Sequence, residues 1–187
     1  MTIASTKMKA HQFLMLGEDP PGVRLELVQG DIVVSPSLSC EHSHADRYLS
    51  ALIIQHIVEN DLGELVGDVD TVFDDLNVRR PDIIFIAKNR LKLRDRRKHG
   101  IRFTPDLCVE ILSPSSVDYD EEEKFAFYAE KGVPHYWIVD PMNRTFRAFK
   151  LGKKGYTETA SGRQKDTMIA PPFPQLKIPL ASIWPPA

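Results

Sequence analysis

The sequence predicts an α/β fold in which a central mixed or largely antiparallel sheet is flanked by helices. Two short apolar runs, residues 106–112 (DLCVEIL) and 135–139 (HYWIV), are typical of buried central strands. A helix-like segment that ends before Gly132 separates them. Between His42 and Asn60, apolar residues recur at helical spacing and predict a long amphipathic helix. Strand, helix and strand therefore follow one another in the second half of the chain.

The structure of the N-terminal part is predicted from its helix-breaking residues and from the alternation of apolar and polar residues. A short leading helix or arm is expected before Gly17, because prolines follow it closely. Residues 24–35 (RLELVQGDIVVS) alternate between apolar and polar and predict a β-hairpin, with Gln29 and Gly30 at its turn.

Further strands are expected on both sides of the central runs. Residues 64–73 and 81–87 are rich in strand-forming types and predict an antiparallel pair joined by the turn DDLN. Residues 144–151 and 155–160 predict outer strands, and the prolines from Pro171 onward predict an irregular tail.

The bulk properties place limits on the function. With 187 residues, 42% hydrophobic and 27% charged, the chain is expected to form one domain over residues 1–187. A net charge of -2 excludes a protein coated in positive charge, so nucleic-acid affinity requires a local patch. Cys40 and Cys108 lack metal-ligand spacing, and neither a signal-peptide core nor a membrane span is recognisable. We therefore expect a cytoplasmic protein that does not enter a membrane.

Two acidic residues carry the predicted chemistry. Asp82 opens the strand PDIIF, and Glu110 lies inside the apolar strand DLCVEIL. An ionised carboxylate is costly to bury unless it is paired or bound to a metal. Magnesium prefers carboxylate, carbonyl and water oxygens, so acids on adjacent strands form a candidate metal site.

The surrounding residues resemble the Uma family of restriction-endonuclease-like proteins, within the PD-(D/E)XK nuclease superfamily. The likeness is carried by RRPDIIFIA (79–87), TPDLCVEILSPSS (104–116) and DYDEEEKFAFYAEKGVPHYWIVDP (118–141), together with the hairpin and EHSH (41–44). It covers about Phe13 to the end of the chain. The resemblance implies a restriction-endonuclease-like core and a magnesium-dependent endonuclease, with manganese as a substitute ion.

The resemblance also implies roles for individual residues. Asp82 and Glu110 become the metal-binding acids, with the backbone carbonyl of Ile111 as a further ligand. The superfamily pattern places a catalytic lysine two residues after the glutamate, where this chain has Leu112. The Uma family resembles a version in which that lysine has moved to the following helix, which here gives Lys124. A lysine near the scissile phosphate can orient water and stabilise developing charge.

The resemblance further implies Glu26 as an additional acid and His42 as a histidine near the site, for which a structural or supporting use is expected. Tyr128 is expected to pack in the core, with a supporting role at the site as its alternative. Each assignment has a structural alternative. Asp82 could cap a turn, Glu110 could pair with an arginine, Lys124 could pair with Asp120 on its helix surface, and Glu26 could be a solvated strand residue.

A basic strip follows the Asp82 strand. Residues 88–100 (KNRLKLRDRRKHG) carry seven cations against one aspartate: Lys88, Arg90, Lys92, Arg94, Arg96, Arg97 and Lys98. Such a strip can neutralise backbone phosphates, and the alternative is an ordinary solvated face. We expect nucleic acid, and duplex DNA in particular, as the partner, with dimerisation expected from analogy alone.

Two other function classes remain open from the sequence. One is a nucleic-acid-binding protein that keeps the fold without cutting, which Leu112 favours. The other is a metal-dependent hydrolase of a small phosphorylated molecule, which needs the same acids without the strip. We also expect the clustered acids to repel one another without metal, so that Asp82→Asn stabilises the metal-free protein.

Overall fold

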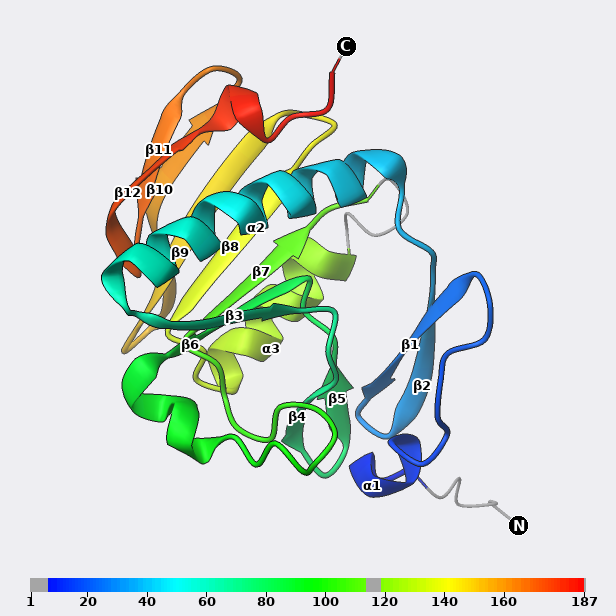
Figure 1. The fold of residues 1–187 in the computed structure, drawn as a ribbon. Helices are drawn as coiled ribbons and strands as arrows, with labels where there is room; N and C mark the ends of the chain where they lie inside the picture. Colours follow the sequence, from blue (N-terminus) through cyan, green and yellow to red (C-terminus); the bar gives the residue numbers. More distant parts are fainter. Residues whose placement is uncertain (1–6, 114–118, 187) are drawn as a thin grey trace.

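The computed structural model describes residues 7–113 and 119–186 (Figure 1). The helical elements are α1 (Ala10–Phe13), α2 (Cys40–Asn60), the 3-10 helix η1 (Lys88–Leu93), the π-helical turn η2 (Tyr119–Lys124), α3 (Phe125–Glu130) and the 3-10 helix η3 (Leu180–Ser182). The strands are β1 (Val23–Val28), β2 (Asp31–Pro36), β3 (Gly63–Gly67), β4 (Thr71–Asp74), β5 (Asn77–Arg79), β6 (Ile83–Ala87), β7 (Leu107–Ile111), β8 (His135–Asp140), β9 (Thr145–Gly152), β10 (Gly155–Arg163), β11 (Thr167–Ala170) and β12 (Phe173–Pro179).

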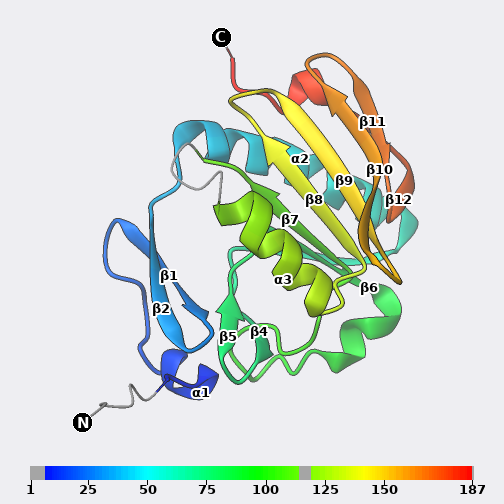
Figure 2. The same cartoon turned by 180° about the vertical axis from the view of Figure 1, so that it is seen from behind.

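A six-stranded sheet forms the centre of the fold, in the order β10-β9-β8-β7-β6-β3. Its β7 and β8 strands run parallel, and the other neighbours in this sheet pair antiparallel. Helix α2 crosses one face of the sheet in Figure 1, and α3 lies on the opposite face in Figure 2. The predicted fold class, a largely antiparallel sheet flanked by helices, is therefore confirmed.

Strand β7 is buried on both faces, and its alternation divides its side chains between the two helices. Leu107, Val109 and Ile111 belong to the core shared with α2, whereas Cys108 belongs to the core that contains residues of α3. Successive side chains of a strand point to opposite faces. Glu110 therefore lies on the same face as Cys108, toward α3.

Helix α2 is longer than the predicted segment by two residues at its start. Ser39 caps it, because its side-chain oxygen accepts a hydrogen bond from the backbone N–H of His42 at 3.2 Å. The apolar stripe of α2 is buried against the sheet and comprises Ala45, Leu49, Ile53 and Ile57. The cap leaves His42 in the first turn, beside the ends of the central strands.

A second sheet, in the order β2-β1-β5-β4, stands beside the first. Its β1–β2 hairpin has the predicted turn, with positive φ at Gln29 and Gly30. The prediction for residues 64–87 was partly wrong. The DDLN turn joins β4 to β5 in this second sheet, and β3 pairs with β6 in the first.

The C-terminal segment differs most from its prediction, since it is not irregular. Strands β11 and β12 form a two-stranded sheet, and their residues Met168, Phe173 and Ile178 belong to the core shared with α2. Prolines are tolerated at strand edges and turns, which is why they do not exclude strands here. Within the described ranges, no helix is both long enough and apolar enough to cross a membrane.

Candidate active site

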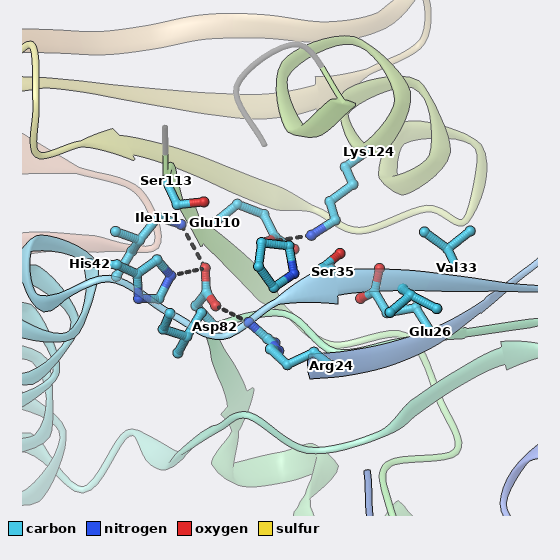
Figure 3. Close-up of a pocket in the computed structure, with 13 residues that line it drawn as sticks. Arg24, Glu26, Val33, Ser35, His42, Asp82, Glu110, Ile111, Ser113 and Lys124 are labelled. Atoms are coloured by element: carbon cyan, nitrogen blue, oxygen red, sulfur yellow. Dashed lines mark hydrogen bonds and ion pairs between the residues drawn. The ribbon is translucent and has the colours of Figure 1, made fainter. Parts of the chain in front are cut away.

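A cavity of about 200 Å³ lies where the β1–β2 hairpin approaches the ends of the central strands (Figure 3). Strands β6 and β7 are antiparallel, with Ile83 paired to Val109, so Asp82 and Glu110 reach the same edge of the sheet. The residues predicted for the site that line this cavity are Glu26, His42, Asp82, Glu110, Ile111 and Lys124. Tertiary folding thus gathers residues from the hairpin, α2, β6, β7 and η2.

Asp82 is held as an ionised carboxylate by three donors. Its Oδ1 lies 3.0 Å from Nη1 of Arg24, and its Oδ2 lies 3.0 Å from Nε2 of His42. The backbone N–H of Ile111 donates to Oδ2 at 2.8 Å. Burial alone raises the pKa of Asp82, but His42, Arg24 and Lys124 outweigh it and lower the pKa to about 2.

Glu110 is only 2% exposed and accepts hydrogen bonds from two side chains of the helical segment across from β7. Nζ of Lys124 donates to its Oε2 at 2.8 Å, and the Tyr128 hydroxyl donates to its Oε1 at 2.6 Å. Burial, with a smaller contribution from Glu110, raises the pKa of Tyr128 well above its ordinary value. Tyr128 therefore stays protonated and acts as a donor.

Glu26 projects from β1 toward the cavity and is buried, which excludes the solvated alternative. It accepts a hydrogen bond from the backbone N–H of Arg80 at 2.7 Å, and its Oε2 lies 3.7 Å from Nη1 of Arg79. Burial raises the pKa of Glu26, but the positive charges of Lys124 and Arg79 outweigh it and lower the pKa. A third ionised acid therefore belongs to this cavity.

The structural alternatives for Glu110 and Lys124 can also be compared with the observed contacts. Glu110 does pair with a base, because Nζ of Lys124 lies 2.8 Å from its Oε2. Lys124 is buried at the cavity. The side chain of Asp120 lies outside the described residues.

Two arginines of the site were missed by the sequence analysis. Arg24 shares a face of β1 with Glu26, because the two residues are separated by one position, and this spacing was a usable signal. Arg79 lies in the three-residue strand β5 with its side chain fully buried. No local sequence pattern predicts a buried arginine, because its partners come from distant parts of the chain.

The basic strip begins at the end of β6 opposite Asp82, and its cations are not among the described residues that line the cavity. Several are paired: Arg90 with Asp106 at 2.9 Å and Arg94 with Glu64 at 2.6 Å. Arg94, Arg96 and Lys98 border a second cavity of about 790 Å³, which also has acidic walls. Paired cations contribute less to phosphate attraction than the sequence count implies.

The ligand atoms at the first cavity are of the type that magnesium prefers, because Asp82, Glu110 and Glu26 supply hard carboxylate oxygens. Across residues 7–113 and 119–186, no three acidic, histidine or cysteine side chains form a ready cluster for a metal. The acids point instead to Arg24, His42, Lys124 and Arg79. Magnesium commonly uses one or two protein carboxylates and completes its shell with water and phosphate, so the residues fit once these partners are exchanged.

The sheet, its flanking helices and the cavity with paired acids and bases at one sheet edge define a protein with a restriction-endonuclease-like fold. The sequence model of the Uma2 family, described as "Putative restriction endonuclease", matches residues 10–181, and the chain belongs to this family. The resemblance found in the sequence is confirmed.

Two individual proteins are similar to this chain. The uncharacterized protein sll1609 of Synechocystis is 26% identical over 144 residues, which are 75% of this chain and 79% of that protein. The crystal structure of a putative nuclease belonging to DUF820 from Anabaena variabilis matches with a TM-score of 0.78. That match covers 95% of this chain and 97% of the other at 20% identity, and it shows the shared fold.

Proposed function

We propose that this chain is a metal-dependent endonuclease that hydrolyses phosphodiester bonds in nucleic acid, with duplex DNA as the expected substrate. The observation that carries the proposal is the meeting of Asp82, Glu110 and Lys124 at one cavity. Membership of a family described as "Putative restriction endonuclease" supports it. Two acids can hold a catalytic metal ion, and a lysine beside them can stabilise the negative charge that develops on a phosphodiester during hydrolysis.

Asp82 and Glu110 would hold the ion, with Glu26 as a nearby acid. A magnesium or manganese ion bound there would offset phosphate charge and lower the pKa of water. The carbonyl of Ile111 as a further ligand stays a prediction, because this residue contacts Asp82 through its N–H.

Lys124 would act on the phosphate and the attacking water. Its ammonium group lies at the cavity, and it is held 2.8 Å from Glu110 in the resting protein. An ammonium in this place can hydrogen-bond a non-bridging phosphate oxygen and stabilise negative charge that develops during attack. Tyr128 is not among the described residues that line the cavity, so it would orient Glu110 without touching substrate.

Arg24 and His42 would keep Asp82 ionised and fixed. Both contact its carboxylate from opposite sides in Figure 3. A charge-assisted hydrogen bond restricts the carboxylate more than a neutral one does. The acid is therefore oriented toward the cavity before any ion or substrate arrives.

The first prediction is that the purified protein cleaves DNA with magnesium or manganese, and that Asp82→Asn and Glu110→Gln each abolish cleavage. Asp106→Asn is the matched control, because Asp106 immediately precedes β7 at the end away from the cavity. A saturating ion at ten times its dissociation constant should add roughly 1.4 kcal/mol to wild-type stability, a rise of about 3 to 6 °C in Tm. Asp82→Asn should lose this rise.

Three outcomes would contradict the proposal in different ways. Undiminished cleavage in both site variants would remove the two acids from the reaction. Salt-dependent DNA binding without turnover would identify a binding protein that does not cut. Turnover of a small phosphate ester, with no effect on any nucleic acid, would point to a hydrolase of phosphorylated small molecules.

A further inference from the structure

We propose that Arg79 is a positioning residue that fixes the helical segment carrying Lys124 against the site, acting through Glu123. The proposal rests on the proposed nuclease function, because it assigns Arg79 a role in placing the ammonium of Lys124. Arg79 is not among the described residues that line the cavity, so its effect must pass through its neighbours.

The environment of Arg79 is unusual for a charged residue. It is one of the largest fully buried side chains, with 1% of the residue exposed. The Arg79 side chain is fully buried, whereas that of Glu123 is 35% exposed. Taking a guanidinium out of water is costly, and attraction to a partly exposed carboxylate offsets that cost only in part. The pair is better explained by the geometry that it specifies than by the free energy of folding.

The contacts of Arg79 join two parts of the site. Its Nη2 donates to Oε1 of Glu123, and its Nη1 lies 3.7 Å from Oε2 of Glu26. Its guanidinium carbon lies 4.5 Å from the ring centroid of Phe127, one turn beyond Glu123. Arg79 therefore links the acid on β1 to the segment formed by η2 and α3.

Glu123 directly precedes Lys124, so a fixed position for Glu123 also restricts the backbone of Lys124. The same segment is held on its other side, where Lys124 and Tyr128 both donate to Glu110. Those contacts involve the acid that would exchange partners when an ion or substrate binds. The Arg79–Glu123 contact involves no proposed metal ligand, so it can hold the segment while the contacts of Glu110 change.

Three variants separate positioning from stability. Glu123→Gln keeps a side-chain oxygen that can accept from Arg79, and Glu123→Leu removes it. The double variant Arg79→Met, Glu123→Leu removes both charges, so that neither member of the pair is left without its partner. Glu158→Leu is the control, because it breaks the Arg147–Glu158 pair on β9 and β10, away from the cavity.

We expect kcat to fall about 100-fold in Glu123→Leu and in the double variant, since a displacement near 1 Å costs about that factor. KM should stay within about threefold, because the substrate contacts remain. Glu123→Gln should recover most of kcat, and Glu158→Leu should match the wild type. Slow turnover in Glu123→Leu as well as in a stable double variant would establish positioning, because Arg79→Met by itself also removes the positive charge beside Glu26. Wild-type kcat in Glu123→Leu and the double variant would overturn the proposal.

Hydrogen exchange provides a readout that does not depend on catalysis. Amides of α3 should exchange faster in Glu123→Leu and in the double variant, with exchange in β7 and α2 unchanged. If the wild type cleaves no nucleic acid but α3 still loses protection in these variants, the proposed function fails and the structural link stands. Unchanged exchange in α3 would show that Arg79 does not hold this segment, whatever the activity.

Discussion

At the scale of single residues, the acids of the site are neutralised by bases of the same chain. Asp82 is paired with Arg24 and His42, Glu110 with Lys124, and Glu26 lies near Arg79. The sequence analysis expected these acids to repel one another in the metal-free protein. The lowered pKa of Asp82 indicates the reverse, because its surroundings favour the charged form over the neutral one.

This arrangement reverses the expected effect of Asp82→Asn on stability. A carboxyl whose folded pKa of about 2 lies below its unfolded value of 3.8 stabilises the native state above about pH 4. That contribution, about 2 kcal/mol, is lost as the pH falls toward 2. Without metal, Asp82→Asn should therefore be less stable than the wild type at pH 7, with a smaller difference at pH 3.

Urea unfolding in chelator at the two pH values measures this difference. Asp61→Asn is a suitable control, because Asp61 is largely exposed at the end of α2. Equal or greater stability of Asp82→Asn at pH 7 would restore the original expectation of repulsion.

At the scale of elements, the site depends on a helical segment that lies across β7 from α2. Segment η2 delivers Lys124 to Glu110, and α3 delivers Tyr128 to the same carboxylate. Lys124, the lysine that we propose for catalysis, thus lines the same cavity as Asp82 and Glu110, although the superfamily pattern assigns this lysine to a strand. Leu112, which occupies the strand position, is buried in the core on the α3 side.

Replacing Lys124 tests this placement. Lys124→Met, which keeps much of the apolar stem, should lower kcat on the order of 100- to 1000-fold while changing metal affinity little. Lys124→Arg should rescue poorly, because a planar guanidinium does not reproduce a compact ammonium. Single-turnover cleavage and metal titration of folded variants provide the two measurements. Wild-type turnover in Lys124→Met would leave Lys124 with a structural role alone.

At the scale of the whole molecule, positive charge is unevenly available for nucleic acid. The side chain of Arg94 is 25% exposed and paired with Glu64, whereas those of Arg96 and Arg97 are 74% and 93% exposed. Exposed cations in high dielectric keep weak partners and can exchange them for phosphate. Fewer cations of the strip are therefore available to bind phosphate than its composition indicates.

Neutralising the strip should change the salt dependence of DNA binding in proportion to the exposed cations. For Arg96→Gln with Arg97→Gln, the log-log slope should change by about 1.8, from about 0.9 per phosphate contact. Adding Arg94→Gln should change the slope little further. Lys153→Gln with Lys154→Gln, in the exposed turn between β9 and β10, is the control pair. A slope that does not respond to Arg96 and Arg97 would leave the strip as a solvated face.

Much of the fold could be predicted from the sequence, because strands, helices and turns depend on local periodicity. The sequence correctly predicted the β1–β2 hairpin, the amphipathic helix α2 and the buried strand β7. The sequence did not show that β3 pairs with β6 and β4 with β5, since strand pairing depends on contacts between distant parts of the chain. The strands of the C-terminal segment were missed because its prolines imitate a loop.

For the site, the sequence by itself determined which acids and which lysine were candidates, through a strand that contains Glu110 and a resemblance that includes Asp82 and Lys124. Only the tertiary structure decided how they are paired. Arg24 is 58 residues from Asp82, and Arg79 is 44 residues from Glu123. Ion pairs of this kind leave no periodic signal in the sequence, because their free energy depends on burial and distance, which exist only after the sheets and helices have packed.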